Sequence, residues 1–451
     1  MTGIPNYIVD NKQFDPDEFF DGNKFLHYKF ASFLYNKHNG CLLEGTPHIY
    51  TGKRYESLDI DRIRVLTLKY IPYLRENQNK ELLFKLKAMC LNNPKEQSPP
   101  NYIGVSNGIY NVLTDELLDF SPDFYITNII NAKYDPNAKS SIIEKFIEDI
   151  ADDDKEVIHL LYEIIGYGLY RENILQVAFF FYSPGGNGKT TLFRLLHKFF
   201  NEENTSALSF NDLNHRFKPA SLQSKLVNIA DDIDPTYIKE TANFKIIVTG
   251  NFLSVERKGQ DDYEFKPYVK LYFAGNELPT SSDKSHGFYR RMVIIPMLRT
   301  FGKDGQKKDP LLVHKLITEE NMSALLNLAI KGLKDVLKRG EIIEPQITKE
   351  TKKEYEVLND PILQFINDAS LDDYRQIPVV EGRPTNKAYE IYRIWCENNG
   401  FKFMSKPRFS RELSRLNYEM VVKWSKANKK SVRFYSKNNT ECFYDYDGNL
   451  L

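Results

Sequence analysis

The stretch FFFYSPGGNGKTTLFRLL, from Phe179 to Leu196, decides the fold. It completes a nearly continuous apolar run, ILQVAFFFY, which predicts a strand buried on both faces, as in a parallel sheet. Leu192, Leu195 and Phe199 then recur at the spacing of a helix. Strand, Gly-rich turn and helix in this order are the context of a phosphate-binding loop.

The turn departs from the consensus of such loops at one position. Ser183 stands where the consensus has its first glycine, whereas Gly188, Lys189 and Thr190 match. Backbone N–H groups are expected to cradle phosphates, Lys189 to hold the β- and γ-phosphates and Thr190 to ligate Mg²⁺. The alternative is a plain Gly-rich turn. The expected cofactors are ATP and Mg²⁺, and the predicted binding segment comprises Ser183, Pro184, Gly185, Gly186, Asn187, Gly188, Lys189, Thr190 and Thr191.

Two later strands are each followed by polar side chains suited to this chemistry. In LVNIADDID, Asp231 and Asp232 follow a short apolar run, which suits one carboxylate near Mg²⁺ and one as the base for water. We place Asp231 at the metal, but which Asp does which remains open. In KLYFAGNELP, Asn276 can hold water or sense the γ-phosphate. The alternatives are a solvated acidic turn and an ordinary Gly-Asn turn.

A pair of arginines precedes a further apolar run in GFYRRMVIIP. Arginine suits bidentate contact with a transferring phosphate, so Arg290 and Arg291 are candidate catalytic residues. An ordinary surface or salt-bridged arginine pair is the alternative.

The order GGNGKTT, LVNIADDID, KLYFAGNELP and GFYRRMVIIP resembles that of the superfamily 3 helicases, above all their phage, plasmid and poxvirus primase-helicase branch. The resemblance implies an AAA+-like fold, hexameric rings and ATP-driven travel along DNA. It implies that Asn276 is the sensor and that Arg291, with Arg290 as the neighbouring candidate, acts on the next subunit.

The same resemblance implies a hairpin between the acidic and sensor strands that presents a basic residue to DNA. LSVE and YEFKPY flank the polar turn RKGQDD, which places Lys258 at or next to the tip, beside Arg257. A solvated hairpin tip is the alternative.

Four parts are predicted along the chain: a mixed α+β N-terminal domain (1–138), a helical collar for oligomerisation (139–172), the ATPase motor (173–350) and a C-terminal domain (351–451). Ordinary core packing is the alternative for the collar helices. Asp59 and Asp61 are a candidate metal pair for a primase, but Ser57 favours a helix N-cap with early acids. We therefore expect a helicase without a primase domain.

The C-terminal domain is predicted to be a winged helix-turn-helix. A helix capped by Thr385 and stopped by Gly400, a second helix in KPRFSRELSRL and two strands around a basic turn give this order. Eleven Lys and Arg stand against two Glu in residues 401–437, a nucleic-acid footprint. The alternative is a protein-docking wing. The candidate DNA-binding residues are Lys258, Arg257, Arg408, Arg411, Arg415, Lys426, Lys429 and Lys430.

Composition sets the remaining bounds. The 451 residues carry no net charge, so any basic surface must be local. Four scattered cysteines indicate reduced thiols, and no apolar run is long enough to span a membrane, so we expect the cytoplasm of a bacterial host cell.

The predicted function is that of an ATP-dependent replicative DNA helicase of a phage or mobile element. The alternative is an origin-binding initiator that melts or marks DNA without processive unwinding. The expected partners are single-stranded and forked DNA, origin duplex, further copies of the chain in a hexamer, and a separate primase or initiator protein.

Overall fold

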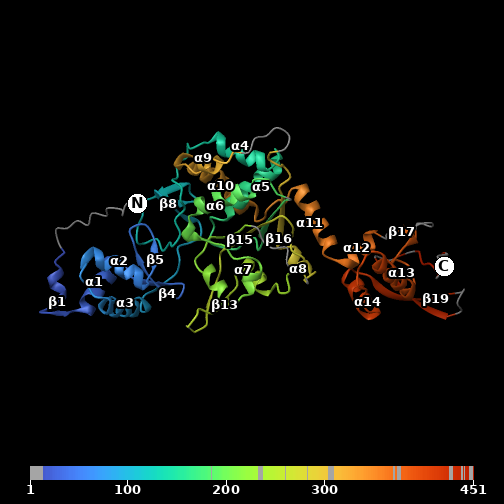
Figure 1. The fold of residues 1–451 in the computed structure, drawn as a ribbon, viewed down its shortest axis with the longest axis horizontal. Coiled ribbons are helices and arrows are strands. Elements are labelled where there is room, and N and C mark those ends of the chain that lie inside the picture. The colour runs from blue at the N-terminus through green and yellow to red at the C-terminus, as the bar shows by residue number, and fades with distance from the viewer. Residues whose placement is uncertain are drawn as a thin grey trace. The chain divides into compact units, whose positions relative to one another are not determined.

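A computed structural model describes residues 14–183, 185–231, 237–259, 261–281, 283–302, 309–368, 371–372, 377–425, 430–437, 440, 442–445 and 450. The chain divides into two compact units, coloured by residue number in Figure 1. The first unit comprises Met1–Pro279 and Arg290–Thr348, and the second comprises Thr280–Tyr289 and Lys349–Leu451. Each unit is described by itself.

The first unit is built on a five-stranded parallel sheet in the order β11-β12-β15-β10-β16. The predicted parallel sheet is thereby confirmed. Apolar side chains fill both faces of the central strands, which explains why β10 reads as a continuous apolar run rather than an alternating one. The strands are β10 (Ala178–Tyr182), β11 (Thr205–Ser206), β12 (Val227–Ala230), β15 (Lys270–Gly275) and β16 (Met292–Pro296).

Helices cover both faces of this sheet. In Figure 1, α4, α5, α6, α9 and α10 lie on one side, and α7 lies on the other. Phe181 packs on Phe193 of α6, whereas its neighbour Phe180 packs on Phe244 of α7, because alternate residues of a strand point to opposite faces. The helices are α4 (Ser141–Ile150), α5 (Lys155–Tyr167), α6 (Lys189–Phe200), α7 (Ala242–Thr249), α9 (Leu312–Leu316) and α10 (Glu319–Arg339).

The two helices predicted as a collar, α4 and α5, contribute their apolar faces to the core of the motor. Val157, Leu161 and Ile164 of α5 are buried in the same cluster as Leu325 and Leu333 of α10. The backbones of α5 and α10 approach closely at Gly166 and Gly332. These buried faces therefore serve core packing, and a role in oligomerisation stays a prediction.

The N-terminal region of this unit combines helices with three small sheets, ordered β1-β2, β5-β4-β3-β6 and β7-β8-β9. One expectation was wrong in detail: Ser57 ends β5, and Asp59 caps α2 by accepting a hydrogen bond from the Arg62 N–H at 2.8 Å. The elements are η1 (Pro16–Phe19), β1 (Phe20–Asp21), β2 (Lys24–Phe25), α1 (His27–Lys37), β3 (Cys41–Leu43), β4 (Thr46–Tyr50), β5 (Tyr55–Ser57), α2 (Ile60–Tyr70), α3 (Glu76–Leu91), β6 (Pro94–Lys95), β7 (Tyr102–Val105), β8 (Gly108–Asn111) and β9 (Glu116–Leu118).

The predicted hairpin between the acidic and sensor strands is present. β13 (Leu253–Val255) pairs antiparallel with β14 (Tyr263–Phe265). Short 3₁₀ segments complete the motor: η2 (Glu202–Asn204), η3 (Asn211–Asn214) and η4 (Lys218–Leu222).

The second unit contains α8 (His286–Tyr289), most of α11 (Gln346–Leu358), α12 (Pro361–Asp368), α13 (Thr385–Asn398) and α14 (Lys406–Arg415), with strands β17 (Leu371–Asp372), β18 (Ile377–Pro378), β19 (Glu419–Ser425) and β20 (Lys430–Ser436). Phe365, Tyr392 and Phe409 form its core. The expected cap was wrong: Pro384 is the N-cap of α13 and Thr385 is its first residue. Gly400, at φ +72°, follows the end of the helix. Helix, helix and antiparallel hairpin occur in the predicted order, and the winged-helix assignment stays a prediction.

Across the described residues, we find no helix with both the length and the apolar character that crossing a bilayer requires.

Candidate nucleotide site and nucleic-acid surfaces

The predicted phosphate-binding loop joins the carboxyl end of β10 to the first residue of α6. Gly185, Gly186 and Gly188 have φ of +111°, +72° and +82°, a region that residues with a Cβ rarely adopt. A cavity of about 500 Å³ opens beside the loop. Its lining consists of Gly185, Gly186, Asn187, Gly188, Lys189, Thr190, Thr191, Asp231, Gly275 and Asn276. The structure therefore brings together the described residues that three separate motifs had singled out.

Lys189 is buried at the floor of this cavity, where the tips of β10 and β15 meet. Its ammonium group donates to the Ser183 carbonyl at 2.6 Å and to the Ser183 hydroxyl at 2.8 Å. It also donates to the Gly275 carbonyl and the Asn276 side-chain oxygen, both at 2.9 Å. Each of these four contacts is with a neutral oxygen.

Ser183, the departure from the consensus, takes part in this arrangement. Its hydroxyl donates to Oδ1 of Asn187 at 2.9 Å while it accepts from Lys189. Both Ser183 and Asn187 are almost completely buried. The serine therefore links the two ends of the loop, a role that a glycine lacks the atoms to fill.

A segment after β16 supports the loop from outside. The Asn187 amide donates to the carbonyls of Met297 at 2.8 Å and Arg299 at 2.6 Å. The Phe301 N–H donates to the Gly186 carbonyl at 2.8 Å. Sequence reasoning missed this support, because backbone acceptors more than 100 residues away leave no pattern in the chain.

Arg299 in turn is bound by three carboxylates at the turn between α4 and α5. Nη1 lies 2.8 Å from Asp149, Nε lies 2.9 Å from Asp152, and Nη2 lies 2.5 Å from Asp153. Hydrogen bonding from Arg299 lowers the pKa of Asp153. The acidic run at 152–154 was the available signal, but its partner was not predictable from spacing.

The remaining predicted catalytic residues lie in different places. Asp231 and Asn276 line the cavity, whereas Asp232 and Pro184 lie outside the described residues. Arg291 precedes β16, and its carbonyl accepts from the Ala178 N–H at the amino end of β10. Because β10 and β16 are parallel, Arg291 lies at the amino ends of the strands, whereas the phosphate-binding loop lies at their carboxyl ends. Arg290 beside it is exposed.

The two basic residues near the turn of the β13–β14 hairpin, Arg257 and Lys258, differ in their contacts. Arg257 donates to Gln223 at 2.7 Å, and its guanidinium lies 4.8 Å from the centre of the Tyr263 ring. Lys258 is exposed at the tip, followed by Gly259 at φ +76°. Both residues are exposed, and they differ in that Arg257 contacts Gln223 and the Tyr263 ring.

In the second unit, α14 presents Arg408 and Arg411 to solvent. Arg415 differs, because it forms ion pairs with the buried Asp360 and with Glu412. Part of its charge is therefore paired with a buried carboxylate, although Arg415 itself is exposed. Lys430 is exposed at the start of β20, and Lys426 and Lys429 lie outside the described residues.

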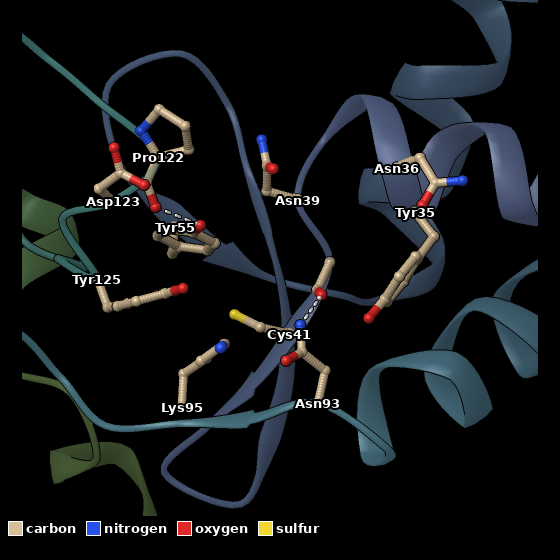
Figure 2. Close-up of a pocket in the computed structure, with 11 residues that line it drawn as sticks. Tyr35, Asn36, Asn39, Cys41, Tyr55, Asn93, Lys95, Pro122, Asp123 and Tyr125 are labelled. Carbon is tan, nitrogen blue, oxygen red and sulfur yellow. Dashed lines mark hydrogen bonds between the residues drawn. The ribbon is translucent and has the colours of Figure 1, made fainter.

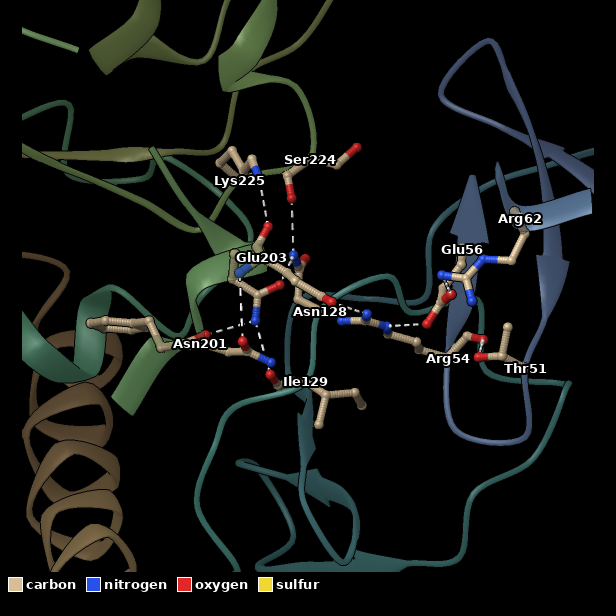
Figure 3. Close-up of polar contacts among 12 residues, drawn as sticks. Thr51, Arg54, Glu56, Arg62, Asn128, Ile129, Asn201, Glu203, Ser224 and Lys225 are labelled. Atoms are coloured by element: carbon tan, nitrogen blue, oxygen red, sulfur yellow. Dashed lines mark hydrogen bonds and ion pairs between the residues drawn. The ribbon is translucent and has the colours of Figure 1, made fainter. Parts of the chain in front are cut away.

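Polar contacts fix the N-terminal region to the motor within the first unit, as Figure 3 shows. Arg54 lies 3.0 Å from Glu56 and also pairs with Glu203 of η2. The Asn128 amide donates to Asn204 and to the Ser224 carbonyl, both at 2.9 Å. These contacts line a cleft of about 820 Å³ to which Arg257 of the hairpin also contributes.

A smaller cavity of about 240 Å³ lies within the N-terminal region (Figure 2). Tyr55 and Tyr125 form one wall, with ring centres 5.1 Å apart, and Cys41 and Lys95 border it. Burial raises the pKa of the Cys41 thiol to about 12, so this cysteine is a poor nucleophile. Among the described residues, no three His, Cys, Asp or Glu side chains are grouped to hold a metal ion.

The fold resembles that of a solved structure, the apo form of the NrS-1 C-terminal region. The similarity covers 93% of this chain and 100% of that one, with a TM-score of 0.54 and 15% sequence identity. The class that fold and sheet define is thus a mixed α/β protein on a parallel five-stranded sheet.

Three family models match separate parts of the chain: "D5 N terminal like" at residues 30–152, "Family of unknown function (DUF5906)" at 181–291, and "Poxvirus D5 protein-like" at 358–447. A putative helicase, L207/L206, of Acanthamoeba polyphaga mimivirus is 24% identical over 331 residues, which is 66% of this chain and 33% of that protein. Putative helicase 121R of Invertebrate iridescent virus 3 is 24% identical over 220 residues, which is 45% of this chain and 23% of that protein.

In separate parts, therefore, the chain is similar to D5-type poxvirus proteins and to putative helicases of two viruses. The matched stretches span a third or less of the length of these curated relatives.

Proposed function

We propose that this chain is an ATP-hydrolysing DNA helicase motor that acts in genome replication of a phage or other mobile element. The observation that carries the proposal is the cavity beside the glycine turn. It combines a buried lysine, three glycines in left-handed conformations and an aspartate at the carboxyl edge of a parallel sheet. Such a site suits the phosphates of a nucleotide.

The residues present fit ATP with Mg²⁺. Thr190, at the start of α6, and Asp231, after β12, both border the cavity and offer the hard oxygen ligands that Mg²⁺ prefers. Bound there, Mg²⁺ would neutralise charge on the phosphates. Lys189 would exchange part of its present carbonyl contacts for phosphate oxygens, and Asn276 would orient water beside them. Asp231 is the described candidate for general base, with Asp232 as its neighbour.

The position of Arg291 supports catalysis between subunits. The five residues of β16 separate this arginine from its own phosphate-binding loop, a span of about 16 Å at about 3.3 Å per residue. An arginine at that edge suits contact with the nucleotide of a neighbouring copy. We therefore propose a ring, with six subunits as the family resemblance implies, and Arg291 rather than Arg290 as the residue that acts in trans.

The proposed path of DNA follows the exposed cations. Lys258 at the tip of the β13–β14 hairpin would contact phosphates in the ring, and Arg408 and Arg411 of α14 would bind DNA in the second unit. An origin-binding initiator without processive unwinding is the alternative, since the basic second unit supports both.

Strand displacement on a labelled forked duplex with ATP and Mg²⁺ tests the proposal. Lys189→Ala should abolish ATP turnover and displacement, because Lys189 is the cationic side chain among the described residues that line the cavity. Lys198→Ala on the exposed face of the same helix is the matched control and should keep both activities. Displacement by Lys189→Ala would refute the site. ATP hydrolysis without displacement by the wild-type protein would favour the initiator.

Arg291→Ala gives a second, independent test. We expect it to lose turnover while it retains nucleotide binding, and a mixture with Lys189→Ala should regain turnover. Mixed rings contain interfaces that join an intact lysine to an intact arginine. Full turnover by Arg291→Ala alone would contradict action in trans.

A further inference from the structure

The β19–β20 hairpin of the second unit carries an exposed apolar stripe. Met420, Val422 and Trp424 alternate along β19, so their side chains share one face. They are 53%, 62% and 65% exposed. The opposite face is covered differently, because Val432 and Phe434 pack with Phe443 in a small core. The stripe is therefore the uncovered side of a hairpin that is otherwise packed.

The stripe lies on the side of the hairpin that meets α14. Tyr435 is paired with Met420 and so points to the same face. Its hydroxyl lies 2.6 Å from the Ser410 hydroxyl of α14, and its ring packs in the core of the unit. Val422 and Trp424 lie further along β19, toward the turn. They project past the point where α14 supports the sheet.

A positively charged side chain, that of Arg433, lies on the same face of the hairpin as the stripe. Arg433 is exposed and is paired directly with Val422 in the sheet. Lys406, the first residue of α14, lies close enough to Arg433 for their charges to repel. Burial and this repulsion both lower the pKa of Lys406. An anion bound near Arg433 on this face would offset such repulsion.

We propose that this face binds single-stranded DNA, with Trp424 stacked on an unpaired base and with Arg433 and Lys406 on the adjoining phosphate. The inference rests on the proposed action on DNA and adds a site for an unpaired base to it. A planar indole on the same face as an exposed arginine is the combination that sequence-tolerant single-strand binding uses. A protein partner would account for the apolar stripe but not for the exposed Arg433 paired with Val422 within it.

The two tryptophans of the chain allow a direct test. Trp395 is buried and stacks on Phe401, with ring centres 5.0 Å apart. A change in fluorescence on adding DNA therefore reports on Trp424. We expect a thymidine oligonucleotide to quench the emission of the full-length protein and an abasic oligonucleotide of equal length to leave it nearly unchanged. Trp395→Phe is the matched control and should retain the quenching.

Affinity gives a second readout. Trp424→Ala should weaken binding of the thymidine oligonucleotide by about 5- to 150-fold, the range for loss of one stacked base, and should leave binding of the abasic strand unchanged. Arg433→Ala should weaken both. These differences between two ligands do not depend on how much each substitution changes stability.

Several results would overturn the inference. Equal quenching by the abasic strand would mean that the protein contacts phosphate alone. Equal quenching by blunt duplex would indicate groove binding. A concentration-dependent shift without DNA would mean that another copy covers the stripe. If the protein displaces strands but its tryptophan emission does not change when DNA is added, the helicase proposal stands and this site is refuted. Quenching without displacement would support the site and refute the helicase proposal.

Discussion

Restoring the consensus glycine at position 183 should weaken this protein rather than improve it. Ser183→Gly removes a buried hydroxyl that accepts from Lys189 at 2.8 Å and donates to Asn187 at 2.9 Å. Asn187 then keeps its two bonds to the segment after β16 but loses its bond to the strand end. The loop is left anchored on one side.

The cost follows from the two hydrogen bonds and the backbone. A bond to a charged donor contributes about 1.5–3 kcal/mol and a neutral one about 0.5–1.5 kcal/mol. The gain in unfolded-chain freedom with glycine adds about 0.5–1 kcal/mol. The free energy of unfolding should therefore fall by about 2.5–5.5 kcal/mol for Ser183→Gly. Ser183→Ala removes the same bonds and should lose slightly less.

Thermal unfolding followed by circular dichroism, with and without ATP, measures this loss. A melting temperature lower by about 5–22 °C is expected, at about 2–4 °C per kcal/mol for a domain of this order. Ser141→Ala, at an exposed position in the first turn of α4, is the control and should change little. A Ser183→Gly protein as stable as wild type, with equal ATP turnover, would refute the reasoning.

Three further outcomes follow from the packing and the charges. Gly332→Ala should destabilise the protein by about 1–3 kcal/mol, because its Cβ would lie 2.3 Å from the Tyr162 backbone. Lys331→Ala is the control. An unchanged melting temperature for Gly332→Ala would contradict the contact between α5 and α10. N-ethylmaleimide at pH 8 should label the exposed Cys442 fastest, because burial raises the thiol pKa of Cys41 and Cys90 to about 12; mass spectrometry after brief labelling checks this. Arg299→Ala should raise the KM for ATP more than it lowers kcat, because this residue supports the loop from behind; steady-state kinetics would show the reverse if Arg299 itself stabilised the transition state.

The sequence was most informative where a signal is local. The buried strands β10, β12 and β15 were predictable because each is a short apolar run with a polar residue at its carboxyl end, and β16 because it is an apolar run that follows two arginines. Parallel pairing then forces those polar ends to one edge, so Lys189, Asp231 and Asn276 meet at one cavity. Local choices between similar residues were less certain: Ser57 and Asp59 both suit a helix N-cap, and pairing of Ser57 in β5 decides between them.

Contacts between distant segments left no signal to read. Arg299 and the carboxylates at the α4–α5 turn are separated by about 150 residues, and charged residues are common at both places. Likewise, the amphipathic pattern of α5 predicts a buried face but not the partner that covers it. Gly166 and Gly332 select that partner, because a side chain at either position would hold α5 and α10 apart.

The position of β16 suggests how two nucleotide sites would communicate in a ring. Its amino end follows Arg291, which the proposal assigns to the nucleotide of a neighbouring subunit. Its carboxyl end leads to Met297 and Arg299, whose carbonyls hold Asn187 of the subunit's own loop. β16 is hydrogen-bonded along its full length to β10, so it is expected to move as a rigid element. Displacement of Arg291 by a neighbour's nucleotide would therefore be transmitted to Asn187, and the order of hydrolysis around the ring would follow from this strand.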